Sequence, residues 1–270
     1  MKTYPATVLE RRQLSAHLVR VTLGRIAGFA STGIPDEYVQ VTVAGGHGEP
    51  TGRIYSVAVH RAGEDGSEID LDIALHDESV GSTWATRCQP GDRVSVTEPH
   101  GMYAAPAGVD RQLLVADITG LPAAARILRE LGAGQAAEVV IVLTDPDDEI
   151  SLPSAGTVEV TWHVVDDLSD IADALTAAVT SRDLAGHYVW LAGEASASRA
   201  VRRHLRRELG WPQSDFYTCG YWQLDAAAKS RRYAEVADEV TERAAAARRQ
   251  LDDEGAYLDA LDDIFEDLGL

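Results

Sequence analysis

Residues 68–76 read Glu-Ile-Asp-Leu-Asp-Ile-Ala-Leu-His, and their pattern guides the interpretation of the first hundred residues. The apolar side chains fall on every second position, which is the period of a β-strand with one buried face. Weaker segments of the same kind surround this strand and are separated by turns that contain Gly, Pro or Asp. They span residues 6–10, 18–23, 38–43, 53–60 and 93–98. Six short strands without intervening helices predict a small antiparallel β-barrel.

The pattern changes near residue 113, where strand-like apolar runs begin to alternate with helix-like segments. This alternation is typical of a parallel sheet with crossover helices. Strands are predicted at 113–116, 138–143, 157–165 and 187–192, and helices at 122–131 and 168–179. A further helix follows the last strand, with an apolar row four residues apart and a stop at Gly210 and Pro212. The row consists of Ala197, Val201, Leu205 and Leu209, and Ser196 is its expected cap.

The last segment, residues 225–270, predicts a helical extension. A long amphipathic helix is indicated by apolar residues three or four positions apart on one face. They are Tyr233, Val236, Val240, Ala244, Ala247 and Leu251. A shorter helix follows Gly255, and residues 252–270 hold eight acids and no Lys or Arg. We expect the long helix to pack on its own domain, with dimer formation through residues 233–251 as the alternative.

Composition excludes several classes of function. The formal net charge of -19 argues against nucleic acid, because phosphate binding needs clustered Lys and Arg. The chain shows no apolar run long enough to span a bilayer and no secretory signal at residues 1–12, so we expect a cytoplasmic protein without membrane insertion. Only Cys88 and Cys219 are present, too few for a four-cysteine iron–sulfur site, and no metal ligands are expected. Any redox chemistry must therefore come from a bound organic cofactor.

A first candidate motif is Arg53-Ile54-Tyr55-Ser56 in the fourth predicted strand. Arg53 and Tyr55 are two residues apart and share one face, so a guanidinium can hold a pyrophosphate while a phenol lies along a flavin ring. Ser56 can bond the edge of the flavin. The alternative is an ordinary barrel strand that carries a surface arginine.

A second candidate motif is residues 79–84, Ser-Val-Gly-Ser-Thr-Trp, just after the strand that ends in His76. Glycine lets backbone approach a ligand closely, and hydroxyls with free N–H groups at a helix start form an anion site. The alternative is a capped turn. Together with Arg53, 28 residues before Gly81, the motif predicts FAD on the barrel.

In the second domain, Asp117 and Thr119 follow the first strand, where nucleotides bind at the carboxyl edge of a parallel sheet. Gly193 and Glu194 follow the strand at 187–192 and occupy the equivalent position. The G-x-G-x-x-G fingerprint is absent. Five arginines then fall within nine positions, 199, 202, 203, 206 and 207, and predict either a solvated helix face or, at Arg199, a phosphate contact.

Further along, residues 190–195 (Trp-Leu-Ala-Gly-Glu-Ala), 199–210 and 219–222 (Cys-Gly-Tyr-Trp) closely resemble the siderophore-interacting protein family. The motifs at 53–56, 75–76, 84–85, 90–92, 99–101 and 117–123 agree in the same order, so the resemblance covers roughly residues 5–222. It implies a two-domain α+β protein with an FAD-binding barrel (1–108), an NAD(P)H-binding-like α/β domain (109–224) and the helical extension (225–270). Its implied activity is the reduction of a ferric siderophore in iron acquisition, with electrons from NAD(P)H or reduced ferredoxin.

Carried over by motif, the resemblance assigns roles to individual positions. One group would hold the flavin and its pyrophosphate: Arg53, Tyr55, Ser56, Val57, His76, Gly81, Ser82 and Thr83. Another would border the nicotinamide: Asp117, Thr119, Gly193 and Glu194. Tyr221 or Trp222 would cover the isoalloxazine, or else belong to the core. No catalytic acid or base is required.

The chain departs from the family pattern at two positions, Ala58, where a second Arg is common, and Gly120, where Ala is common. The acids Asp145, Asp147 and Asp148 favour a ribose hydroxyl over a 2′-phosphate, hence NADH over NADPH. Two other functions stay open: a general flavin or ferredoxin reductase without siderophore preference, and a non-enzymatic scaffold that binds flavin or an iron chelate.

Overall fold

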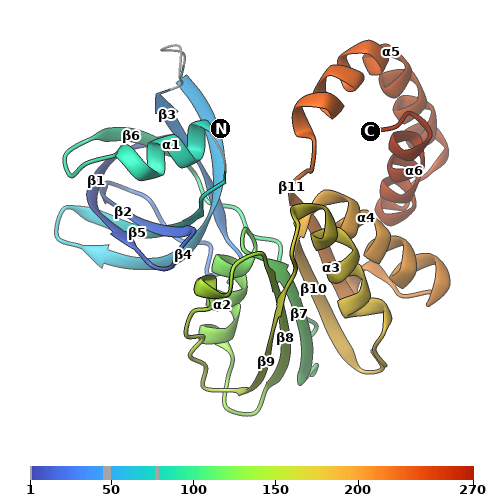
Figure 1. Cartoon of the computed structure of the whole chain (residues 1–270), viewed down its shortest axis with the longest axis horizontal. Helices are drawn as coiled ribbons and strands as arrows, with labels where there is room; N and C mark the ends of the chain where they lie inside the picture. Colours follow the sequence, from blue (N-terminus) through green and yellow to red (C-terminus); the bar gives the residue numbers. More distant parts are fainter. Residues whose placement is uncertain (1, 45–49, 77–78) are drawn as a thin grey trace.

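The computed structural model describes residues 2–44, 50–76 and 79–270. Figure 1 shows a β-barrel, a sheet flanked by helices and a C-terminal pair of helices that stands beside the sheet. The described chain contains no helix with the length and hydropathy needed to cross a membrane.

The N-terminal half is a closed antiparallel barrel with strand order β1-β2-β5-β4-β3-β6, which confirms the prediction. The strands are β1 (Thr3–Gln13), β2 (Leu18–Ile26), β3 (Tyr38–Ala44), β4 (Pro50–Gly63), β5 (Gly66–Ala74) and β6 (Arg93–Thr97). A short helix, α1 (Val80–Arg87), lies between β5 and β6. These elements place the Arg53–Ser56 motif on β4 and the Ser79–Trp84 motif at the start of α1.

Strand β5 has two buried faces, where the alternating sequence predicted one. Ile69, Leu71 and Ile73 enter the barrel core, and Asp70 and Asp72 on the other face are only 5% and 6% exposed. Arg20 Nε lies 2.6 Å from Asp72 Oδ1, and Arg61 donates to both oxygens of Asp70. The acids tolerate burial because neighbouring strands supply their counter-charges.

The second half is a parallel sheet with helices on both faces, as predicted. Its strands, in the order β11-β10-β7-β8-β9, are β7 (Arg111–Asp117), β8 (Ala136–Leu143), β9 (Thr157–Val164), β10 (His187–Glu194) and β11 (Phe216–Trp222). Helix α2 (Leu121–Glu130) covers one face, and α3 (Ile171–Thr180) and α4 (Ala195–Arg203) cover the other. The strand order reverses at β7, which pairs with both β8 and β10, so the carboxyl ends of β7 and β10 form a crevice.

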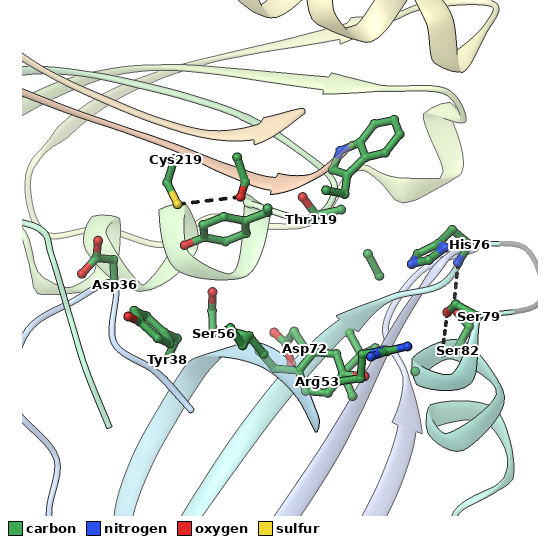
Figure 2. A pocket seen from close by; sticks show the side chains of 18 of the residues that line it. Asp36, Tyr38, Arg53, Ser56, Asp72, His76, Ser79, Ser82, Thr119 and Cys219 are labelled. Carbon is green, nitrogen blue, oxygen red and sulfur yellow. Dashed lines mark hydrogen bonds between the residues drawn. The ribbon is translucent and has the colours of Figure 1, made fainter. Parts of the chain in front are cut away.

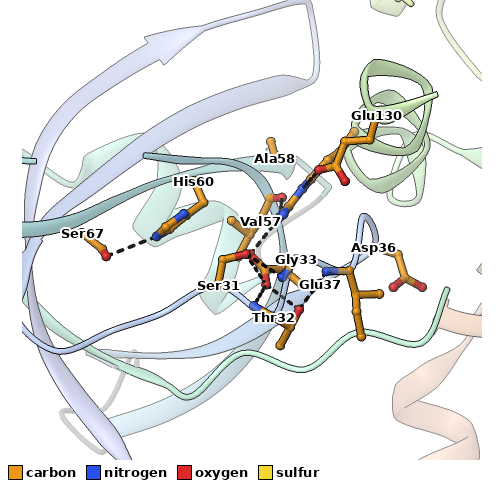
Figure 3. A network of polar contacts seen from close by, with 12 residues as sticks. Ser31, Thr32, Gly33, Asp36, Glu37, Val57, Ala58, His60, Ser67 and Glu130 are labelled. Atoms are coloured by element: carbon orange, nitrogen blue, oxygen red, sulfur yellow. Dashed lines mark hydrogen bonds and ion pairs between the residues drawn. The ribbon is translucent and has the colours of Figure 1, made fainter. Parts of the chain in front are cut away.

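Helix α2 also joins the sheet to the barrel. Arg126 Nη1 donates to Glu37 Oε1 and to Val57 O, both at 2.9 Å, and Arg129 donates to Ala58 O. Figure 3 shows Glu37 enclosed by Ser31 and Thr32, whose hydroxyls also donate to it. The carbonyls that α2 holds follow directly after Arg53–Ser56, so this helix fixes the end of that motif.

The C-terminal extension forms two helices, α5 (Ala226–Gln250) and α6 (Glu254–Asp267). Val240 of α5 packs against Ile264 and Leu268 of α6, whereas Tyr233, expected on the same apolar face as Val240, is 45% exposed. Helix α6 contacts α4, and α5 contacts α6, so the long helix is attached to the sheet domain through α6. Dimer formation through α5 stays an untested alternative.

The arginine row on and after α4 has a partner that the sequence did not reveal. Arg202, Arg203, Arg206 and Arg207 form ion pairs with acids of the α6 segment. These are Asp262 for Arg202, Glu266 for Arg203, Asp253 and Asp259 for Arg206, and Asp263 for Arg207. All four arginines contact the α6 segment. The prediction of a solvated helix face is wrong for Arg202 and Arg206, whose side chains are only 12% and 16% exposed, whereas Arg203 and Arg207 remain at the surface.

Candidate functional site

A cavity of about 580 Å³ lies between the barrel and the carboxyl edge of the parallel sheet. Figure 2 shows Tyr38, Arg53, Ser56 and His76 on the barrel side. Thr119 and Cys219 face them from the sheet. The two motifs on the barrel and the loop after β7 thus meet at one cavity, although they are far apart in sequence.

The Arg53–Ser56 motif forms one wall of this cavity. Among the described residues, Arg53 donates only to the neighbouring Gly52 O, at 3.0 Å, so most of its donors remain available there. Tyr55 Oη is buried and has no hydrogen-bond partner within the described chain. Ser56 Oγ lies close to the Tyr221 hydroxyl but lacks a hydrogen bond of ordinary geometry there. Buried polar atoms left this way cost about 1–3 kcal/mol each, which favours a polar ligand in the cavity.

Tyr55 would be neutral at pH 7 even with an ordinary phenol pKa, and burial reinforces this state. Burial raises the pKa of the phenol to about 12, with the charge of Arg53 opposing the shift. Tyr55 is therefore a neutral phenol at pH 7 and can donate a hydrogen bond. Its ring stacks on Trp84 of α1, with the centroids 6.2 Å apart.

The start of α1 forms the second wall. Ser79 caps the helix by accepting from Ser82 N at 3.0 Å, and Ser82 Oγ accepts from His76 N at the same distance. A Cβ on Gly81 would lie 2.5 Å from Tyr55 Oη, so glycine is needed for the phenol to approach the helix. Ser79, Gly81 and Ser82 line the cavity, whereas Thr83 is exposed and lies outside its lining.

On the sheet side, Asp117 organises the wall without lining it. Its Oδ1 accepts from Thr119 N at 2.8 Å and Oγ1 at 2.6 Å, and its Oδ2 accepts from Trp222 Nε1 at 2.7 Å. Burial raises the pKa of this carboxyl, and the hydrogen bonds from Thr119 and Trp222 oppose the shift. A Cβ on Gly193 would lie 2.5 Å from Asp117 Oδ2, so the glycine leaves space for the carboxyl.

Glu194 lies behind the cavity as well. Its Oε2 accepts from Ser196 N and Ala197 N and so caps α4, while Oε1 accepts from Leu224 N at 3.1 Å. These contacts fix the segment that leads from β11 to α5. Asp117, Gly193 and Glu194 thus support the wall that Thr119, Tyr221 and Trp222 present to the cavity.

Two other predicted contacts need correction. Val57, expected to line the flavin, is 1% exposed and packs in the barrel core, so only its backbone is near the site. Asp148, expected near a ribose, is 1% exposed and accepts hydrogen bonds from Ser15 Oγ and His17 N. Gly120, which replaces a common Ala, has an evident cause, because a Cβ there would lie 2.3 Å from Ala192 O.

Several lining residues were not assigned from the sequence, among them Asp36, Tyr38, Tyr217 and Cys219. Tyr38 lies opposite Ser56 in the β3–β4 register, and Asp36 is held by the amides of Met102 and Tyr103. Tyr217 and Cys219 share a face of β11 with Tyr221. The alternation in β11 was a signal for the last pair, whereas no local pattern marks Asp36 or Tyr38.

Comparison with known families identifies the domains that meet at this cavity. Residues 109–225 match the siderophore-interacting protein family, and residues 42–103 match the siderophore-interacting FAD-binding domain. The chain belongs to the siderophore-interacting protein family. This confirms the resemblance seen in the sequence.

Individual relatives of this family member support the same placement. An uncharacterised protein of Mycobacterium tuberculosis is 28% identical over 253 residues, with 80% of this chain and 88% of that protein covered. The NADPH-dependent ferric-chelate reductase of Escherichia coli is 25% identical over 238 residues, covering 80% and 91%. The crystal structure of a siderophore utilization protein from T. fusca superimposes with a TM-score of 0.71 at 26% identity, covering 83% of this chain and 94% of that one.

Proposed function

We propose that the chain is an FAD-dependent reductase that reduces a ferric siderophore and so releases iron as Fe(II). The observation that carries the proposal is the cavity wall of Arg53, Tyr55 and Ser56, in which available donors and unpartnered hydroxyls face a space at a domain junction. The family match and the E. coli ferric-chelate reductase support the same chemistry.

The residues present fit FAD. Arg53 supplies a guanidinium for the pyrophosphate, and the start of α1 supplies the backbone N–H of Gly81 and the hydroxyl of Ser82. Tyr55, which is neutral at pH 7, and Ser56 supply a ring face and a hydroxyl for the isoalloxazine. Thr83 and His76 are proposed, with less support, to lie on the adenine side of the site. Bound FAD would supply the change from a two-electron donor to single-electron transfer, which Fe(III) requires.

The donor is proposed to approach from the sheet side, where Thr119 and Trp222 face the cavity. Asp117, Gly193 and Glu194 act by holding these side chains in place. We propose NADH, because residues 144–152 contain no Lys or Arg to bind a 2′-phosphate, while Asp145, Asp147 and Glu149 add negative charge to this loop. Reduced ferredoxin is the alternative donor.

Release of iron follows from the chemistry of the chelate. Siderophore oxygens are hard ligands that hold Fe(III) far more firmly than Fe(II). The chain therefore needs to place a chelate near the cofactor and requires no acid or base of its own.

An anaerobic experiment tests the proposal. The FAD-loaded protein is reduced with NADH, NADPH or reduced ferredoxin, mixed with ferric siderophores, and followed by flavin absorbance with a ferrous trap present. We expect reoxidation and trapped Fe(II), and at least tenfold weaker FAD binding in Arg53→Ala. Rates equal to those with simple ferric salts would identify a general reductase, and a protein that cannot be loaded with FAD would exclude both.

A further inference from the structure

The charge of the cavity wall carries information about the substrate. Of the side chains that line the cavity in the described chain, Arg53 is the only Lys or Arg. Among the described lining residues, His76 is the only histidine, and the acids are Asp36 and Asp72. The residues outside the described ranges, 1, 45–49 and 77–78, contain no Lys or Arg either. A substrate with several negative charges would therefore meet one guanidinium.

Ion pairs within the chain neutralise one of the two lining acids. Asp72 is neutralised by Arg20, with Nε 2.6 Å from its Oδ1. Asp36 accepts from the amides of Met102 and Tyr103 and from Trp190 Nε1, and these groups are uncharged donors. Arg53 and Asp36 thus balance each other before any cofactor is considered. An FAD pyrophosphate would add two negative charges and occupy Arg53, so the loaded site would be anionic.

The rest of the wall consists of neutral groups. Tyr38, Tyr55, Tyr217, Tyr221 and Cys219 line the cavity together with Ile54, whose side chain is 64% exposed. Phenols and thiols are protonated at pH 7 at their ordinary pKa values, and burial raises the pKa of Tyr55, Tyr217, Tyr221 and Cys219 further, so these groups carry no charge. Such a wall suits an uncharged organic ligand, since charged ligands need paired counter-charges when desolvated.

The first Lys and Arg residues that follow β11 in the chain belong to α5, and they do not line the cavity. Lys229, Arg231 and Arg232 are in its early turns. Arg232 donates to Leu268 O and Glu235 Oε2. The overall charge of -19 adds long-range repulsion of anions.

We propose that this site selects ferric chelates that are neutral or cationic, of the trishydroxamate class, and discriminates against trianionic tris-catecholates. The inference rests on the proposed function and names its substrate class. Three hydroxamates, each with one negative charge, neutralise Fe(III), whereas three catecholates leave a trianion. Hard oxygen ligands of both kinds hold the ion, so the charge of the complex is what the wall can distinguish.

Binding of gallium complexes tests the proposal without any reduction step. Ga(III) replaces Fe(III) at the same charge and accepts no electrons under these conditions. The FAD-loaded protein is titrated with gallium desferrioxamine, which is cationic, gallium ferrichrome, which is neutral, and gallium enterobactin, a trianion, by calorimetry at about 0.05 M and 0.5 M salt. We expect the first two to bind at least about tenfold more tightly than the third at low salt, and the gap to narrow at high salt.

Ile54→Lys adds a cation to the wall, and Ile54→Gln is its uncharged control. We expect the lysine variant to bind the trianion roughly three- to tenfold more tightly than the glutamine variant at low salt, with little change for the neutral complex. Trianion binding by the unaltered protein that equals or exceeds hydroxamate binding would overturn the proposal. A loss of that binding in Lys229→Gln/Arg231→Gln would then assign it to α5.

Failure of the proposed function has a different signature. In that case none of the gallium complexes would bind, and reduced flavin would not be reoxidised by any ferric siderophore. Failure of the charge selection alone would leave reoxidation intact and show a tightly bound trianion.

Discussion

Replacing Arg126 with Met removes the guanidinium that joins α2 to the barrel. The side chain of Arg126 is 7% exposed and that of Glu37 is fully buried. Loss of one partner of a buried ion pair costs about 3–5 kcal/mol in folding free energy. Ser31 and Thr32 still donate to Glu37, so we expect the lower end, about 3 kcal/mol.

A double-mutant cycle in urea isolates the pair. The unfolding free energies of Arg126→Met, Glu37→Gln and the double variant are measured by urea titration. We expect a coupling energy of about 1–3 kcal/mol between the two positions. Glu130→Gln is the matched control, because Glu130 also pairs with Arg126 but is 41% exposed, and its cost should stay below about 0.5 kcal/mol. Additivity of the two single changes within about 0.3 kcal/mol would refute the reasoning.

The same pair predicts a pH dependence. Burial opposes the charge of Glu37, but hydrogen bonds from Thr32 and Arg126 and the charge of Arg126 outweigh it, so the pKa of Glu37 is lowered. A lowered pKa in the folded state adds stability above the unfolded pKa, and this stability is lost as pH falls through the folded pKa. In Glu37→Gln the unfolding free energy should therefore decline less steeply with falling pH below about pH 5. The same decline in the variant and the unaltered protein would contradict this.

Other positions give independent tests. Gly81→Ala should weaken FAD binding about tenfold in a fluorescence titration, because the new Cβ meets Tyr55 Oη; Gly134→Ala, with open space around it, should leave binding unchanged. Gly193→Ala should lower the unfolding free energy by about 1–3 kcal/mol in urea by displacing Asp117, and a neutral result would contradict the contact. Raising salt from about 0.05 to 1 M should speed amide exchange in α6 about tenfold relative to the barrel, because ion pairs attach it to α4; equal rates would show that apolar packing dominates.

The sequence predicted the architecture because both halves carry local periodic signals. Period-two alternation marked the barrel strands, and the change to alternating runs and helices marked the parallel sheet. The local pattern did not predict what each face would contact. Asp70 and Asp72 read as a solvent face, but Arg61 and Arg20 from neighbouring strands cover them, and that pairing depends on strand register.

For the candidate site, contiguous motifs were located and distant partners were not. Arg53 and Tyr55 lie two positions apart on one strand, so their common wall followed from the strand period, whereas Ser56 was expected on the opposite face and its place in the lining did not follow from that period. Tyr38 reaches the cavity through the β3–β4 register, which no local pattern encodes. The arginines of α4 were misread for the same reason, since their acidic partners lie about fifty residues further along the chain.

The placement of α2 restricts how far the two walls of the cavity can move relative to each other. This helix begins two residues after Thr119, on the sheet side, and its Arg126 and Arg129 hold the carbonyls that follow Ser56, on the barrel side. The two walls are therefore tied to one rigid element, and a closing motion of one domain on the other would break buried hydrogen bonds. Under the proposed function, donor and iron chelate would enter a gap of fixed width, and selection between chelates would rest on the chemistry of the wall rather than on closure around the substrate.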